Sequence, residues 1–242
     1  MLTKRKGRAL AIALFIALET VLFFLIQLSG GVVLRAFEFS SVVCALGFSL
    51  TFVSSASEDI STAAGLLFTV ISDLFLVVIE PQYKLVAMIF FSLAQLSYFS
   101  RLLTAEGDKK RRRAHLFIRK CVSLGVIILT LIVLKDKADA LSLVSMFYYA
   151  NLALNIVYAV IYSRQSLLFP IGLTFFILCD TVVGLSVMDG MYFDFGENSF
   201  VYKLIHADIN LVWLFYVPSQ TLIALSIPER QSRGASSNKW NK

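Results

Sequence analysis

The chain has 242 residues, of which 58% are hydrophobic and only 16% are charged, and its mean hydropathy is +0.78. This composition excludes an ordinary soluble domain of the same length and predicts a polytopic membrane protein. The formal net charge of +6 lies in the segments that flank the apolar runs.

Eight apolar runs are long enough to cross a hydrocarbon layer of about 30 Å at about 1.5 Å per helical residue. In chain order they cover Leu10–Leu28, Phe37–Val53, Ala63–Ile79, Lys84–Leu103, Ile118–Leu134, Asp139–Tyr162, Leu167–Val187 and Ile209–Ile227. Because the runs are continuous and do not alternate with polar residues, they exclude the short strands of a membrane β-barrel. The sequence therefore predicts an all-α integral membrane protein with eight transmembrane helices.

Basic residues are distributed unequally between the two sides of the predicted bundle. Seventeen of the 22 lie in the N-terminal segment, in and beside the loop around Lys110, at Arg164 and in the C-terminal tail. By the positive-inside rule, both termini are expected in the cytoplasm. The run DKKRRR at residues 108–113 lies between two spans, so we interpret it as a topology anchor and expect no nucleic-acid partner.

Residues 1–228 are expected to form one membrane domain of eight spans. The polar residues 229–242 that follow it are expected to form a short cytoplasmic tail that is disordered or lies on the membrane surface.

Two aspartates lie inside apolar spans in matching contexts. GLLFTVISD ends at Asp73 and GLTFFILCD ends at Asp180, and both segments carry a glycine, a phenylalanine and an aspartate at the same spacing. A carboxylate at bilayer depth costs several kcal/mol unless it is protonated or paired, so an intramembrane acid indicates a functional site by default. The repeated pattern predicts a parallel internal repeat, with halves of about 1–104 and 115–228, whose third and seventh spans meet at one polar site.

Each aspartate span is followed by a span that carries a glutamine and a tyrosine on one helical face, Gln95 with Tyr98 and Gln220 with Tyr216. Counted along the apolar runs, both glutamines and both aspartates fall about 15–18 Å from a helix end, near the middle of the bilayer. We interpret the two glutamine–tyrosine pairs as substrate-binding side chains of a polar chamber: Gln95, Tyr98, Tyr216 and Gln220. The alternative is that they only hydrogen-bond neighbouring helices.

Two further groups of polar residues lie within spans. Asn151 and Asn155 form a stripe with Tyr148 and Tyr158 on the sixth span, and this stripe either lines the chamber or bonds a neighbouring helix. Glu19 in the first span is either a third acid of the chamber or the partner of a tyrosine or serine.

Four stretches, GLLFTVISDLFLVV, FFSLAQLSYFSRL, GLTFFILCDTVVGLS and YVPSQTLIALS, resemble in order the signature regions of the YhhN family. That family consists of eight-helix membrane proteins, and its animal members are lysoplasmalogenases. The resemblance runs from about Gly65 to Ser226. Two positions depart from the common pattern: Ser72 stands where a glycine usually precedes the first aspartate, and Gln95 stands where a histidine is frequent.

The resemblance implies cleavage of the vinyl ether of a lysoplasmalogen, which releases a fatty aldehyde and a glycerophospho-alcohol. A vinyl ether is hydrolysed by protonation on carbon, and water then captures the oxocarbenium ion, so the reaction needs a proton donor and a base. Two carboxyl groups in a chamber of low dielectric constant meet this need, because their repulsion keeps one protonated while the other ionises. Asp73 and Asp180 are therefore the candidate catalytic residues, with a lysophospholipid or another lipid as substrate and membrane lipids as surroundings.

Other functions are compatible with the same residues. Proton-coupled transporters also combine parallel repeats with acids at the middle of the membrane, and a non-catalytic relative would bind lipid without cleaving it. The two histidines of the chain, His115 and His206, are too few for the zinc site of a metal-dependent lipid hydrolase, and no G-x-S-x-G motif marks a nucleophilic serine. We expect neither a metal nor a cofactor.

Overall fold

The computed structural model describes residues 2–79, 81–162 and 166–240, and within these residues the chain is helical apart from turns and loops. Arg164 and Lys242, two of the basic residues that predict the topology, lie outside the described residues. The α-helices are α1 (Leu2–Leu28), α2 (Gly31–Phe52), α3 (Ser57–Asp73), α4 (Lys84–Ala105), α5 (Lys109–Leu134), α6 (Ala140–Ile161), α7 (Leu168–Met188), α8 (Phe200–Ile205) and α9 (Leu211–Trp240).

Eight of these helices are long and apolar enough to cross a membrane, which confirms the predicted fold class. Among the helices described, α8 is the one too short to span. The span that contains α3 begins at Ser57 and continues to Ile79 through a π-helical segment, Leu74–Ile79. α5 begins at Lys109, because the basic residues of its first turns continue the helix beyond the apolar run that predicted it.

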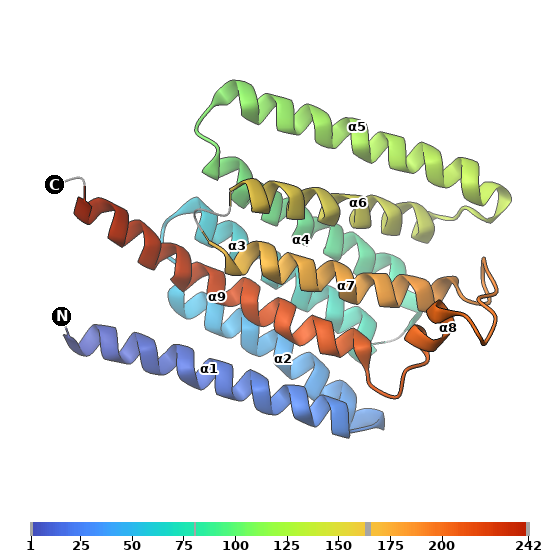
Figure 1. Cartoon of the computed structure of the whole chain (residues 1–242), viewed down its shortest axis with the longest axis horizontal. Coiled ribbons are helices and arrows are strands. Elements are labelled where there is room, and N and C mark those ends of the chain that lie inside the picture. Colours follow the sequence, from blue (N-terminus) through green and yellow to red (C-terminus); the bar gives the residue numbers. More distant parts are fainter. Residues whose placement is uncertain (1, 80, 163–165, 241–242) are drawn as a thin grey trace.

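The helices form one bundle, with α1 and α5 at opposite edges (Figure 1). α3 packs most closely against α4, and α7 packs most closely against α9, while α5 packs mainly against α6. The spans of α9 and α4 are 56% and 50% buried inside the bundle, whereas that of α5 is 11% buried, so α4 and α9 lie in the centre. The start of α1 and the end of α9 lie at the same end of the bundle, which we call the terminal end (Figure 1).

Residues 229–240 continue α9, so the first alternative for the tail, disorder, is wrong for these residues, and its place on the membrane surface stays a prediction. Two charged side chains anchor the first turn of this extension. Glu229 accepts hydrogen bonds from the hydroxyl of Ser166 at 2.5 Å and from the backbone N–H of Leu168 at 3.0 Å, at the start of α7. Arg230 donates to a carboxylate oxygen of Asp59 at 2.9 and 2.7 Å. These contacts hold the polar segment against the ends of α3 and α7.

The glycines of the two matching segments make the same kind of helix contact. A Cβ atom built on Gly65 would lie 2.2 Å from Cε1 of Tyr98 on α4, and one built on Gly172 would lie 2.9 Å from Cγ1 of Ile223 on α9. Each glycine thus lets its aspartate helix approach the next span of the same half. The shared contact agrees with an internal repeat, which stays a prediction.

Tags inserted at either terminus or beside Lys110 are expected on the cytoplasmic face, and a tag at Glu197 on the opposite face, because of the excess of basic residues near the first three sites. The start of α1, the end of α9 and the connection between α4 and α5 all lie at the terminal end, whereas the α7–α8 connection lies at the other end (Figure 1). Labelling of each inserted tag in intact and in permeabilised cells measures on which face of the membrane the tag lies. Labelling of the Glu197 site from the cytoplasm alone would contradict the orientation.

Candidate functional site

Asp73 is the last residue of α3 and passes directly into the π-helical segment Leu74–Ile79. Such segments are rare and recur at functional sites, because the extra residue in the turn redirects side chains. The Asp73 side chain is buried, and it accepts a hydrogen bond of 2.6 Å from the hydroxyl of Tyr216 on α9. The carboxyl group therefore points into the bundle toward the last span.

Asp180 lies on α7 and is half-buried. Its carboxylate accepts a hydrogen bond from the hydroxyl of Tyr148 on α6. The charge of Asp180 acts on Asp73, and the charges of both acids act on the buried thiol of Cys179. Two acids that lie 107 positions apart in the sequence thus each have a tyrosine as hydrogen-bond donor.

Aromatic rings fill the space around the two tyrosines. Phe176 packs edge to face against Tyr216 and Tyr148, with ring centroids 5.4 and 6.4 Å apart, and Phe91 of α4 contacts Phe176 and Tyr148 at 5.9 and 5.5 Å. The sequence predicted a polar chamber here, whereas the structure shows carboxyl–tyrosine pairs embedded in aromatic packing.

The carboxyl–tyrosine pairs lie in the half of the bundle away from the terminal end. Tyr216 is five residues from the start of α9, and Tyr148 is eight from the start of α6, about 8 and 12 Å along the helices. Asp180 is eight residues before the end of α7. The sequence placed Asp73 near mid-span, but α3 begins at Ser57 rather than near Ala63, and this longer span shifts Asp73 toward the far end.

A second polar group joins three helices. Asn155 on α6 donates hydrogen bonds to the side-chain oxygen and the backbone oxygen of Gln95 on α4, at 3.0 and 2.8 Å. Its own side-chain oxygen accepts a bond of 2.9 Å from Arg119 on α5. All three side chains are buried. Gln95 and Asn155, both candidate residues of the predicted chamber, thus contact each other. Their hydrogen-bond chain ends at Arg119, which in the sequence counted only as one of the basic residues that predict the topology.

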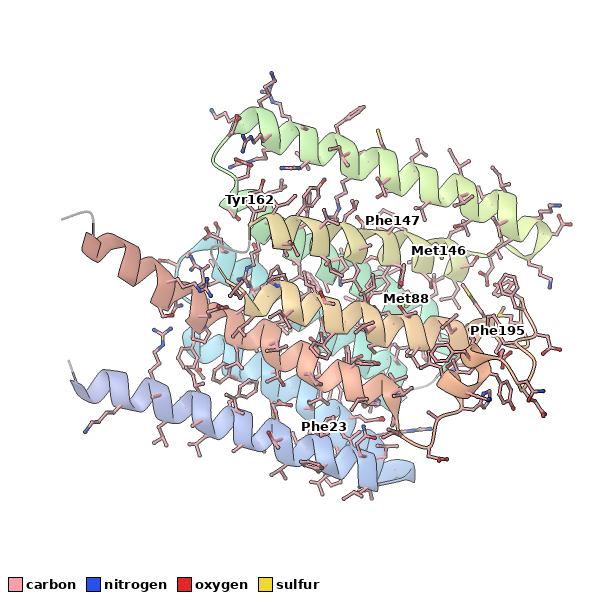
Figure 2. The ribbon with its side chains drawn as sticks, viewed as in Figure 1. Phe23, Met88, Met146, Phe147, Tyr162 and Phe195 are labelled. Atoms are coloured by element: carbon pink, nitrogen blue, oxygen red, sulfur yellow. The ribbon has the colours of Figure 1, made fainter. Side chains whose placement is uncertain are left out.

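The remaining predicted binding residues make local contacts. Asn151 donates to the backbone oxygen of Phe147, labelled in Figure 2, at 2.6 Å and to the hydroxyl of Ser123 at 3.3 Å. Gln220 is buried beside Ser219, with 3.5 Å between their polar atoms. Tyr98, which is fully buried, packs against Gly65 as described above. Oε1 of Gln220, the hydroxyl of Tyr98 and Oδ1 of Asn151 are buried without a hydrogen-bond partner among the described residues, so substrate binding and helix packing both stay predictions for these three residues.

Sequence reasoning missed one acid and left the role of another open. Glu38 on α2 is buried, and its charge acts on Asp73. Its position inside the predicted span Phe37–Val53 is the signal that could have identified it. Glu19 accepts a hydrogen bond of 2.6 Å from Ser41, which confirms the predicted serine partner.

The model of the YhhN family matches residues 34–227, a range that contains both aspartates, their tyrosine partners and the Gln95–Asn155–Arg119 group. Neither the curated proteins nor the solved structures contain a match to the chain.

Proposed function

The chain belongs to the YhhN family, whose match covers most of it, and on this premise we propose that it is a membrane-embedded hydrolase that cleaves the vinyl ether of lysoplasmalogens. The observation that carries the proposal is the pair of carboxyl–tyrosine contacts, Asp73 with Tyr216 and Asp180 with Tyr148, whose two tyrosine rings both pack against Phe176. Acids placed in this way serve reactions in which one carboxyl group donates a proton and the other accepts one.

In the proposed reaction, the protonated carboxyl of the pair donates its proton to the alkenyl carbon that does not bear oxygen. The carbon–carbon double bond thereby becomes a single bond, and the neighbouring carbon becomes an oxocarbenium ion. The ionised carboxyl takes a proton from a water molecule as that water attacks the cation. The protonated carboxyl then donates its proton to the glycerol oxygen of the hemiacetal while the ionised carboxyl takes the hydroxyl proton, so the carbon–oxygen bond breaks, the glycerol leaves as an alcohol and the chain leaves as an aldehyde. The net change is the addition of one water, and the pair recovers its single proton.

The tyrosines position the acids for these steps. Tyr148 and Tyr216 each donate a hydrogen bond to one carboxyl oxygen, so the second oxygen of each acid is the one available to substrate or water. In the proposed mechanism the two acids share one proton, which belongs to the pair rather than to either residue. The aromatic packing of Phe91 and Phe176 keeps bulk water from the oxocarbenium ion.

Purified protein in detergent is expected to release a fatty aldehyde from a 1-alkenyl lysophospholipid, and none from the 1-alkyl lysophospholipid of the same chain length. The alkyl ether has no double bond to protonate, so it binds without reacting. Aldehyde is measured by a coupled dehydrogenase or by mass spectrometry. Absence of aldehyde from protein that still binds both lipids would refute the proposed hydrolase and leave a lipid-binding protein.

A further inference from the structure

Buried hydrogen-bond donors without partners gather in the contact between α5 and α6 near the terminal end. Arg112, His115 and Arg119 are three and four residues apart on α5, so they share one helix face. Tyr158 and Tyr162 lie opposite them on α6. The His115 ring is 4.6 Å from that of Tyr158, centroid to centroid, and His115 Nε2 is 2.9 Å from the Tyr162 hydroxyl. We call these five residues the α5–α6 seam; Figure 2 labels Tyr162 at its end.

Arg119 is the most deeply placed cation of the seam. It is 6% exposed, its Nη1 donates to Asn155, and its guanidinium carbon lies 4.0 Å from the centroid of the Phe99 ring. Nε and Nη2 are buried and have no hydrogen-bond partner among the described residues, nor does any described carboxylate lie within 4.0 Å of the group. A guanidinium is always charged, and a buried charge without a counter-ion costs several kcal/mol.

Three neighbouring groups share this lack of partners. The hydroxyl of Tyr158, Nδ1 of His115 and Nε of Arg112 are buried and make no hydrogen bond to a described residue. Buried polar groups in native proteins are nearly always bonded, so several free groups in one place indicate a missing partner. Since arginine can only donate, that partner must accept several hydrogen bonds and carry negative charge.

The nearest acid of the seam is already engaged. Glu106 accepts a hydrogen bond of 2.5 Å from the Tyr162 hydroxyl and one of 2.9 Å from the backbone N–H of Asp108. The Tyr162 hydrogen bond is the main cause that lowers the pKa of Glu106, so this side chain is a carboxylate at neutral pH. Its Oε2 lies 3.9 Å from His115 Nε2. Glu106 thus supplies negative charge beside His115 and Tyr162, whereas no described carboxylate lies beside Arg119.

We propose that the α5–α6 seam binds the phosphate group of a lysophospholipid, with Arg119 as its central ligand. A phosphate accepts several hydrogen bonds at once, and two N–H groups of one guanidinium match its oxygens in a bidentate pair. The Tyr158 hydroxyl supplies a third donor beside Arg119. The inference rests on the proposed function, because it assigns the seam to the headgroup of the substrate whose vinyl ether lies at the aspartates.

The spacing along α6 agrees with one ligand that reaches both places. Arg119 is bonded to Asn155, and Asp180 is bonded to Tyr148, seven residues earlier on the same helix, which is about 10 Å of helix. In a lysophospholipid, the glycerol carbons and their oxygens separate the phosphate from the vinyl ether, so the two groups lie on one extended chain. With its phosphate toward the terminal end, the alkenyl chain of the lipid runs toward the other end. A lipid in the membrane leaflet at the terminal end has this orientation.

The test measures binding, so it does not depend on turnover. The probes are a 1-alkyl lysophosphatidylcholine, which carries the phosphate but is not cleaved, and the corresponding 1-alkylglycerol, which lacks the phosphate. Arg119→Gln in the full chain is expected to weaken binding of the first probe about ten- to hundredfold, the effect of losing hydrogen bonds to a charged group. Binding of the second probe is expected to stay unchanged. Arg113→Gln, which removes an exposed charge from the same helix, is the matched control and should alter neither affinity.

A second variant covers the case in which Arg119→Gln fails to fold. Tyr158→Phe keeps the ring and removes a buried hydroxyl without a partner, so the unfolding temperature should not fall, while binding of the phosphate probe weakens severalfold. Unchanged binding of that probe in both folded variants, or an equal loss for both probes, would overturn the site. Inorganic phosphate that binds as tightly as the lipid probe would overturn the assignment to a lipid headgroup. Phosphate-selective binding without aldehyde release would refute the hydrolase and leave the seam as proposed.

Discussion

Replacing Asp180 or Asp73 by asparagine is expected to lower aldehyde release by about 10²–10⁴-fold, the usual contribution of a general acid or base. Asparagine has nearly the same shape, and its amide oxygen still accepts the hydrogen bond from Tyr148 or Tyr216. It neither donates an acidic proton to carbon nor takes one from water. Both variants should therefore fold normally but release aldehyde much more slowly. The measurement is the initial rate of aldehyde release from a 1-alkenyl lysophospholipid.

The controls for this prediction separate chemistry from folding. Asp194→Asn, in the exposed connection between α7 and α8, removes an acid of the same type and should leave the rate unchanged. Both active-site variants should bind the uncleaved 1-alkyl lysophospholipid about as tightly as the unmodified protein does. A rate close to normal in either the Asp73 or the Asp180 variant would exclude that residue from the catalytic pair.

Gly65→Ala is expected to destabilise the protein by about 1–3 kcal/mol, the usual cost of forcing extra volume into a packed core. The added Cβ would lie 2.2 Å from Cε1 of Tyr98, whose ring is fully buried and also packs against Phe169 at a centroid distance of 5.7 Å. The ring has no free space to move into, so α3 and α4 must separate. Since α3 ends at Asp73, the same shift would also move one carboxyl group. Thermal unfolding in detergent measures the first effect, and the rate of aldehyde release measures the second.

Gly125→Ala on α5 is the matched control, because nothing lies within 4 Å of the added atom. Alanine is a better helix former than glycine by up to about 1 kcal/mol, so this variant should be as stable as the unmodified protein or more so. Equal unfolding temperatures for the Gly65 and Gly125 variants would show that the close contact between α3 and α4 is absent in solution.

The eight spans could be predicted from the sequence because the signal is local. Each apolar run must satisfy its own backbone hydrogen bonds in lipid, and only a helix does this within one segment. The same cost of burying polar groups identified Asp73 and Asp180 as unusual, since an acid inside such a run is costly unless it is protonated or paired. The helix ends were less accurate, as at Ser57 and Lys109, because charged and polar residues prolong a helix without any change in hydropathy.

Only the tertiary structure decided which side chains meet. Helical spacing shows which residues share a face but not which helix lies opposite that face, so the sequence could not assign a hydrogen-bond partner to either acid. In the structure, Asp73 is bonded from the last span and Asp180 from the sixth. Arg119 shows the same limit. In the sequence it is one basic residue among many beside a basic loop, and only the packing of α5 on α6 buries its guanidinium next to Asn155 and Phe99, with two nitrogens left free.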